Sequence, residues 1–281
     1  MSPLEVRPGF LAQMAHASRA RARELAARMG APELERRACA APPPPPLRLS
    51  AAGFDLVAEV KFASPAAGLL ASSAGLARAT EQARRYERAG AAAVSVLTEP
   101  TRFAGALAHL EAVARAVLVP VLRKDFLVDP LQVHEARIAG ASGVLLILRM
   151  LDESTLEAML AAAQVSGLFV LLEAFDEAEL ERAAELVVRT AGERVLVGVN
   201  ARDLETLAVV PERHLALARY LPPGVPCVAE SGIASPADAR AAAEAGYRLA
   251  LVGSALMRAV DPVAVASELL EGGRSGVRRR P

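Results

Sequence analysis

Short apolar runs recur along the chain, and each of them ends on a charged or polar residue. Six of these runs are VAEVK, VPVLRK, FVLLE, VLVGVN, VPCVAE and LALVGS, which end on Lys61, Lys124, Glu173, Asn200, Glu230 and Ser254. Continuous apolar runs of this length are typical of parallel strands that are buried on both faces. Because the polar residue always stands at the C-terminal end, the pattern predicts that these side chains meet at one rim.

Helical segments separate the apolar runs and carry clear start signals. Asp129-Pro130, Ser235-Pro236 and Asp261-Pro262 each place a capping side chain before a proline. Strands are expected to start near Asp55, Ala92, Pro120, Gly143, Phe169, Val195, Val225 and Leu249. This alternation predicts an α/β fold, specifically a (β/α)8 TIM barrel with an N-terminal helical extension. An open doubly wound sheet is the competing arrangement, and the absence of G-x-G-x-x-G after the first strand disfavours a dinucleotide-binding version of it.

The region before the barrel has a different pattern. Residues 9–29 form an amphipathic, arginine-rich stretch that predicts a helix, and APPPPPLRLS at 41–50 predicts an extended connector, since consecutive prolines cannot continue a helix. We therefore expect three parts: an extension and proline-rich connector (1–50), the barrel (51–272) and a flexible basic tail (273–281).

Composition narrows the class of protein. The 281 residues are 53% hydrophobic with a formal net charge of zero, which predicts a large core and disfavours a nucleic-acid binder with a broad basic surface. The two cysteines, Cys39 and Cys227, predict no structural disulfide and suit a reducing cytoplasm. No apolar stretch is long enough to span a membrane. We expect a cytoplasmic monomer or weak homo-oligomer with a small-molecule ligand, and no membrane or nucleic-acid partner.

The residues at the strand ends suggest acid–base chemistry. Glu59 and Lys61 lie two positions apart and so point to the same side, which predicts an ion pair near the rim. Lys124 is placed to act as a proton donor or anion clamp, while Arg123 should face the other way. Glu173 in an apolar mouth suits a general base, and Asn200 suits the orientation of a hydroxylated substrate.

Two glycine-containing loops predict a phosphate site. Glu230-Ser231-Gly232 and Gly253-Ser254 follow the seventh and eighth strands, where barrels often bind phosphate through backbone N–H groups. The loop from Ser64 to Gly68 is made of small residues that can fold over a ligand. The histidines, His16, His109, His134 and His214, do not end strands, so we expect no metal, no cofactor and no Ser-His-Asp triad.

Taken together, the motifs resemble those of the indole-3-glycerol phosphate synthase family, over about residues 54–270. The matching segments are AEVKFASPAAG, YERAGAAAVSVLTE, PVLRKDFLVDPLQVHEAR, GVLLI, LLEAFDEAEL, VGVNARDLETL, VAESGI and LVGSALMR. The N-terminal helix also resembles the extension that lies near the active site in that family. The resemblance implies a cofactor-free enzyme that closes the pyrrole ring of an N-aryl deoxyribulose phosphate with loss of carbon dioxide and water.

The resemblance also assigns roles to individual residues. Lys124 would protonate the substrate carbonyl, Glu173 would act as the base, and Glu59 and Lys61 would assist decarboxylation and dehydration, with Lys61 also near the substrate carboxylate. The remaining positions form three groups: Asn200 and Arg202 at the sugar-derived hydroxyls; Phe103, Phe126, Leu145 and Leu204 around the aryl ring; and Ser64, Gly232, Gly253 and Ser254 around the phosphate. Glu230 and Ser231 complete the expected substrate-binding set.

The sequence departs from the family pattern at a few positions, namely Phe62, Ala66, Ala67, Phe175 and Ala201. These departures leave two alternatives open. One is a paralogue that acts on a modified anthranilate-derived substrate in secondary metabolism, and the other is a non-catalytic barrel that binds a phosphorylated ligand.

Overall fold

Eight parallel strands close into a barrel in the computed structural model, which describes residues 9–65, 68–70, 75–189 and 194–277. In their order around the barrel, the strands are β1 (Asp55–Val60), β10 (Leu249–Val252), β9 (Cys227–Glu230), β8 (Val195–Asn200), β7 (Phe169–Ala174), β6 (Gly143–Ile147), β5 (Val121–Lys124) and β4 (Ala93–Leu97). Every neighbouring pair is parallel, and β1 joins both β10 and β4 to complete the closure. The predicted (β/α)8 barrel is confirmed, and the predicted strand starts agree with the observed ones to within two residues.

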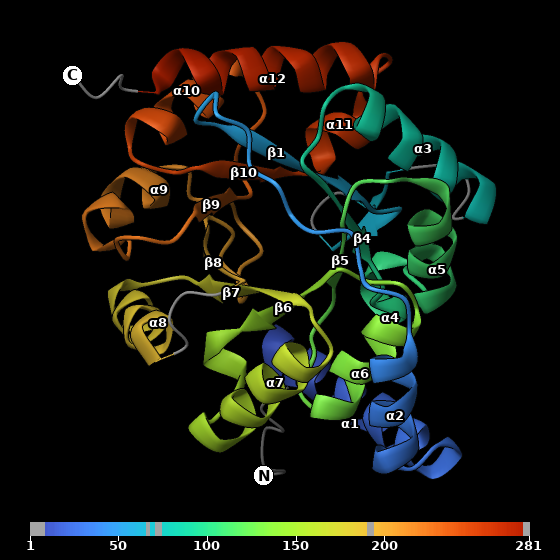
Figure 1. Cartoon of the computed structure of the whole chain (residues 1–281). Coiled ribbons are helices and arrows are strands. Elements are labelled where there is room, and N and C mark those ends of the chain that lie inside the picture. The colour runs from blue at the N-terminus through green and yellow to red at the C-terminus, as the bar shows by residue number, and fades with distance from the viewer. Residues whose placement is uncertain (1–8, 66–67, 71–74, 190–193, 278–281) are drawn as a thin grey trace, which may run out of the picture.

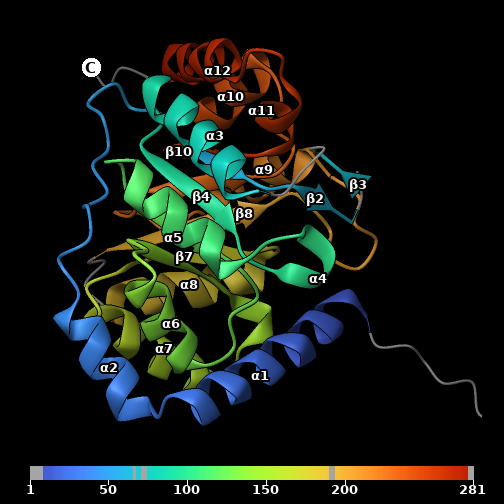
Figure 2. The same ribbon diagram turned by 90° about the vertical axis from the view of Figure 1, so that its right-hand side faces the viewer.

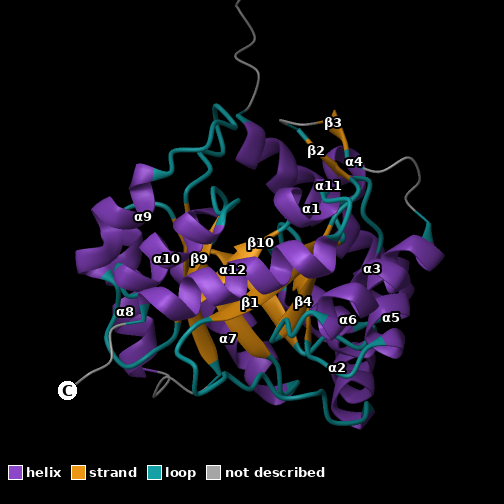
Figure 3. Ribbon diagram, turned by 90° about the horizontal axis from the view of Figure 1, so that it is seen from above, coloured by secondary structure: helices purple, strands orange, loops and turns teal. Residues whose placement is uncertain are grey.

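Helices surround the strands (Figure 3). They are α3 (Leu76–Arg88), α4 (Pro100–Phe103), α5 (Leu107–Ala116), α6 (Pro130–Ile138), α7 (Glu153–Val165), α8 (Glu177–Arg189), α9 (Glu212–Leu217), α10 (Pro236–Glu244), α11 (Ser254–Arg258) and α12 (Pro262–Gly276). Two 3₁₀ turns, Leu148–Met150 and Ala218–Tyr220, complete the set. The helix α12 continues past residue 272, where we expected the tail to begin, and the arginines at 278–280 lie outside the described residues.

The predicted caps form at the helix starts. Asp129 accepts a hydrogen bond from the Leu131 N–H at 2.9 Å, and Asp261 accepts from Val263 at 3.0 Å. Ser235 and Asp238 form a complete capping box at α10. Such side chains satisfy backbone donors that have no partner inside the helix, so each cap fixes where a helix leaves its strand.

Two hydrophobic layers hold the barrel together. Residues on the outer faces of the strands pack against the helices, while alternate residues fill the interior, among them Val57, Leu122, Leu145, Leu171, Leu196 and Val228. The interior is therefore a packed core.

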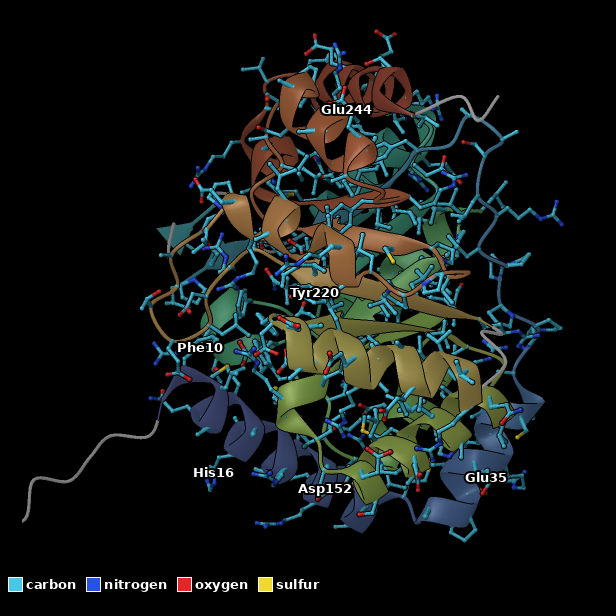
Figure 4. The ribbon with its side chains drawn as sticks, turned by 90° about the vertical axis from the view of Figure 1, so that its left-hand side faces the viewer. Phe10, His16, Glu35, Asp152, Tyr220 and Glu244 are labelled. Carbon is cyan, nitrogen blue, oxygen red and sulfur yellow. The ribbon has the colours of Figure 1, made fainter. Side chains whose placement is uncertain are left out.

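The N-terminal extension contains two helices, α1 (Phe10–Arg28) and α2 (Ala31–Ala40). We predicted the first but not the second. Residues 41–50, which we call the proline strap, then cross the N-terminal end of the barrel to reach β1 (Figures 1 and 2). Figure 4 labels Phe10, at the end of α1 nearest the carboxyl ends of the strands, and Glu35, in α2. The extension therefore runs along the side of the barrel from one end to the other.

A short antiparallel pair, β2 (Ala63–Ser64) and β3 (Gly68–Leu69), follows β1 and was not predicted. It lies at the same end of the barrel as the carboxyl ends of the strands (Figure 2). Ala66 and Ala67, two of the departures from the family pattern, lie outside the described residues.

Candidate active site

A cavity of about 220 Å³ opens at the carboxyl end of the barrel. It is lined by every predicted site residue except Ser64: Glu59, Lys61, Phe103, Lys124, Phe126, Leu145, Glu173, Asn200, Arg202, Leu204, Glu230, Ser231, Gly232, Gly253 and Ser254. Ser64 is buried in β2, opposite Gly68, and is not part of the lining. The structure thus brings together residues that are up to almost 200 positions apart in the sequence.

Lys124 stands between two buried carboxyl groups. Its Nζ lies 3.3 Å from Oε2 of Glu173 and 3.8 Å from Oε2 of Glu230, and both carboxyl groups are about 1% exposed. Burial disfavours the charged ammonium, but the carboxylates of Glu173, Glu230 and Glu59 outweigh this and raise the pKa of Lys124 above its ordinary value. Lys124 is therefore protonated at neutral pH and can donate a proton.

Glu230 is in an unusual environment. Neither of its carboxyl oxygens has a hydrogen-bond partner among the described residues, although the residue is only 1% exposed. Burial, reinforced by repulsion from Glu173, raises the pKa of Glu230 well above its ordinary value, against the opposing effect of Lys124. A buried carboxyl group without a hydrogen-bond partner favours its neutral form, so Glu230 can hold a proton although Lys124 lies 3.8 Å away.

A second ion pair stands at the end of β1. Lys61 Nζ lies 2.7 Å from Oε2 of Glu59, which confirms the predicted pair. The pair sits directly beside the β10 loop, because a Cβ atom on Gly253 would lie 3.0 Å from Lys61 Cε. A larger residue at this position would therefore require the Glu59 and Lys61 side chains to move.

Asn200 and Arg202 are fixed by the loop that follows β8. Asn200 Oδ1 accepts a hydrogen bond from the Arg202 N–H at 2.9 Å, so the side-chain amide N–H₂ is the group that Asn200 can offer to a ligand. Arg202 Nη1 donates to the Leu207 carbonyl at 2.7 Å. Burial lowers the pKa of Arg202, partly offset by Glu59, yet a guanidinium stays charged at any physiological pH.

Aromatic and aliphatic side chains form an apolar wall of the cavity. The rings of Phe103 and Phe126 have centroids 6.0 Å apart, and Phe10 of α1 meets Phe126 edge-on at 5.8 Å. Leu145 and Leu204 continue this wall and are both buried. The cavity thus combines apolar surface for a planar ring with charged groups for acid–base chemistry.

Some lining residues were not predicted as site residues. The charged one among them is Asp125, which directly follows Lys124 in the RKDF segment, and that adjacency was the available signal. The others are apolar: Leu97, Ile147, Val209, Ile233, Ala234, Leu251, Val252 and Ala255. Apolar residues at strand ends give no sequence signal that separates a cavity wall from ordinary core.

The described departures from the family pattern do not line the cavity. Phe62 packs edge-on against His109 at 5.0 Å, and Phe175 lies beneath the guanidinium of Arg149 at 4.1 Å. Ala201 is fully buried, with its N–H bonded to the Glu230 carbonyl at 2.8 Å. These three positions therefore lie outside the cavity lining.

Two features are absent from the described part of the chain, a metal-binding cluster and a membrane-spanning helix. No group of three or more histidine, cysteine, aspartate or glutamate side chains there could hold a metal ion. No helix among those residues is long and apolar enough to cross a membrane.

The fold resembles those of several solved structures. The chain matches 3-hexulose-6-phosphate synthase from Salmonella typhimurium with a TM-score of 0.62 at 16% identity, over 79% of this chain and 99% of that one. Orotidine 5'-phosphate decarboxylase from Pyrococcus horikoshii matches with a TM-score of 0.56 at 17% identity, over 79% and 99%. At such low identity these likenesses concern the fold alone.

The sequence comparisons are more specific. The family model for indole-3-glycerol phosphate synthase matches residues 13–269. Curated indole-3-glycerol phosphate synthases share 43% identity in Mycolicibacterium vanbaalenii (90% of this chain, 89% of that protein) and 49% in Micrococcus luteus (75% of each). The protein of that name from Mycobacterium leprae is 45% identical over 85% of this chain and 86% of its own length. The chain therefore belongs to the indole-3-glycerol phosphate synthase family.

Proposed function

We propose that the cavity at the carboxyl end of the barrel performs the reaction of this family with the residues described above. The substrate is 1-(2-carboxyphenylamino)-1-deoxyribulose 5-phosphate, and the products are indole-3-glycerol phosphate, carbon dioxide and water. The observation that carries the assignment is the position of the Lys124 ammonium, 3.3 Å from Glu173, facing a cavity with an aromatic wall.

The first step forms the carbon–carbon bond. The ring carbon that bears the carboxylate attacks the ketone carbon, and Lys124 transfers a proton to the ketone oxygen as its negative charge develops. The raised pKa of Lys124 keeps this proton available at neutral pH. General acid–base catalysis of this kind contributes about 10²–10⁴-fold.

The two losses follow. Breaking the bond to the carboxylate releases carbon dioxide and returns its electron pair to the aromatic ring. The former ketone oxygen, now a hydroxyl, leaves as water when it receives a proton, and a base removes a proton from the adjacent CH₂ to form the pyrrole double bond. Glu173 is the proposed base, and the Glu59–Lys61 pair assists both losses, with Lys61 near the departing carboxylate.

The remaining groups hold the flexible substrate in a reactive shape. Backbone N–H groups around Gly232, Gly253 and Ser254 bind the phosphate, Asn200 and Arg202 contact the sugar-derived hydroxyls, and Glu230 and Ser231 complete the wall between them. Phe103, Phe126, Leu145 and Leu204 contact the aryl ring. Holding both ends of such a chain can contribute about 7–11 kcal/mol of the barrier reduction. Ser64 is assigned to the phosphate by family resemblance alone.

The test is direct. The purified protein is incubated with the substrate, and indole fluorescence is followed together with carbon dioxide release. We expect the two to appear in equal amounts. A barrel that binds the substrate without producing either would be the non-catalytic alternative, and product formation only from a ring-substituted analogue would favour the paralogue.

A further inference from the structure

We propose that Arg21 of the N-terminal helix is a positioning residue for Lys124 and for the aromatic wall, acting through Asp125 and Glu99. The inference rests on the proposed function of Lys124. It starts from the observation that one side chain of the extension bridges two buried carboxylates that lie beside the cavity. Arg21 Nη2 lies 2.7 Å from Asp125 Oδ1, and Nη1 lies 3.7 Å from Glu99 Oε1.

Asp125 organises the backbone that directly follows Lys124. Its Oδ1 accepts the N–H of Phe126 at 2.8 Å, and its Oδ2 accepts the Thr98 hydroxyl at 2.7 Å. Thr98 in turn donates its backbone N–H to the Lys124 carbonyl at 3.0 Å. The direction of the Lys124 side chain therefore depends on where the Asp125 carboxylate is held.

Glu99 organises the neighbouring edge. Its carboxylate caps α4 by accepting the N–H groups of Thr101 and Arg102 at 2.9 Å and 2.7 Å, and α4 ends on Phe103. One guanidinium thus links the segment that carries Lys124 and Phe126 to the segment that carries Phe103. A planar guanidinium with separate Nη1 and Nη2 donors suits this bridge, whereas an ammonium reaches only one of the two carboxylates.

Other contacts between α1 and the barrel also hold the N-terminal helix in a defined position. Ser18 and Gln132 are both buried and hydrogen-bonded, at 2.9 Å from Gln132 Nε2 to Ser18 Oγ. Met14 is buried against the apolar wall of the cavity, and Phe10 packs on Phe126. Asp125 keeps a second cation, since Arg123 Nη2 lies 3.5 Å from its Oδ2. Removing Arg21 therefore leaves Asp125 paired and the protein able to fold.

The experiment compares Arg21→Gln with Arg28→Gln. Both remove one charge from α1, but the Arg28 side chain is 71% exposed, and its ion pair within the described part of the chain is with Glu135, at 3.5 Å. Because small displacements of a catalytic group can cost up to about 100-fold, we expect Arg21→Gln to lower kcat by about tenfold, with a smaller change in KM. Arg28→Gln should keep the parent kcat, and urea unfolding should give the two variants similar midpoints.

Two further measurements separate positioning from general destabilisation. Arg21→Lys should recover part of the lost kcat. In a double-mutant cycle, Arg21→Gln should add little to the loss caused by Asp125→Asn, because both act through one contact. An Arg21→Gln enzyme with parental kcat, or equal kcat losses in Arg21→Gln and Arg28→Gln, overturns the proposal. Either result leaves the role of Lys124 standing, since the parent enzyme would still be active and Lys124→Met inactive.

Discussion

The two ends of the barrel differ in how their buried carboxyl groups are paired. At the carboxyl end, Glu59, Glu173 and Glu230 crowd around two lysines, and the Glu230 oxygens lack a hydrogen-bond partner among the described residues. At the amino end, Asp55 is just as buried but is fully paired, with Arg248 at 2.9 Å, Arg274 at 3.7 Å and the Ser50 N–H at 2.8 Å. A buried carboxylate whose oxygens are all paired stabilises the fold, whereas a buried carboxyl group without a hydrogen-bond partner is typical of a functional site.

Cavity size alone would point to the wrong end. The space beneath the proline strap is about 590 Å³, larger than the 220 Å³ of the active-site cavity. Its lining includes Phe169, Leu196 and prolines of the strap, but no acidic residue from the described part of the chain. The convergence of several titratable groups, and not volume, distinguishes the end that carries the reaction.

The largest expected effect separates the two ends by activity. Lys124→Met should lower kcat by about 10²–10⁴-fold because the proposed general acid is lost, while the protein remains folded. Arg248→Met, at the amino end, is the matched control and should lower the urea midpoint while the folded enzyme keeps its kcat. Fluorescence kinetics and urea unfolding check both. Near-normal turnover of the Lys124 variant would exclude its role as the acid.

The next effect concerns the proposed base. Glu173→Gln keeps the shape of the side chain but cannot accept a proton, so kcat should fall by about 10²-fold or more with little change in KM. Steady-state kinetics over a range of substrate concentrations give the two parameters separately. A change confined to KM would mean that Glu173 binds substrate and does not act as the base.

A large effect on stability is expected at the opposite end. Phe169 begins β7, lines the cavity beneath the strap and packs so closely that a Cβ on Gly143 would meet its ring. Phe169→Ala should lower the free energy of unfolding by about 3–5 kcal/mol, as is typical of a truncated core aromatic. The kcat of the folded fraction should be unchanged. A selective loss of kcat without a loss of stability would show that the two ends are coupled.

The smallest effect sharpens the contrast through pH. Because the pKa of Glu230 is raised by folding, the folded state holds this proton more tightly than the unfolded chain does. The stability contributed by protonated Glu230 is present at low pH and is lost as pH rises toward the raised pKa. Glu230→Gln does not titrate, so its stability relative to the parent should rise with pH, by at most about 1.4 kcal/mol per pH unit. Urea unfolding between about pH 5 and 8 measures the difference in unfolding free energy between Glu230→Gln and the parent. A difference that stays constant with pH would contradict the prediction.

The barrel and most of its rim followed from the sequence because six of the eight barrel strands end at an abrupt change from apolar to polar residues. The predictions that Arg123 and Lys124 face opposite sides, and that Glu59 pairs with Lys61, hold in the structure. Both depend only on the alternation of side chains along a strand.

What the sequence did not reveal depends on contacts between distant segments or on weak local signals. The ion pair between Arg21 and Asp125 spans 104 positions, and no local pattern in the sequence indicates it. The helix α2 is short, begins directly after Gly30 and has Pro32 in its first turn, and we predicted no helix between Gly30 and the proline-rich connector. The β2–β3 pair has two residues in each strand, too few to show a period. Ser64 was assigned by analogy and lies outside the cavity lining, because that hairpin directs it into the protein.

The wrapped extension has a consequence for how the chain is made. Ser18 is hydrogen-bonded to Gln132, 114 positions later, so α1 leaves the ribosome long before the surface that covers Met14 exists. Nascent α1 must therefore remain undocked, with its apolar side exposed to chaperones or to other chains, until α6 has been synthesised. The third β/α unit of the barrel, β5 with α6, is thus the point at which translation first allows the amino-terminal arm to dock.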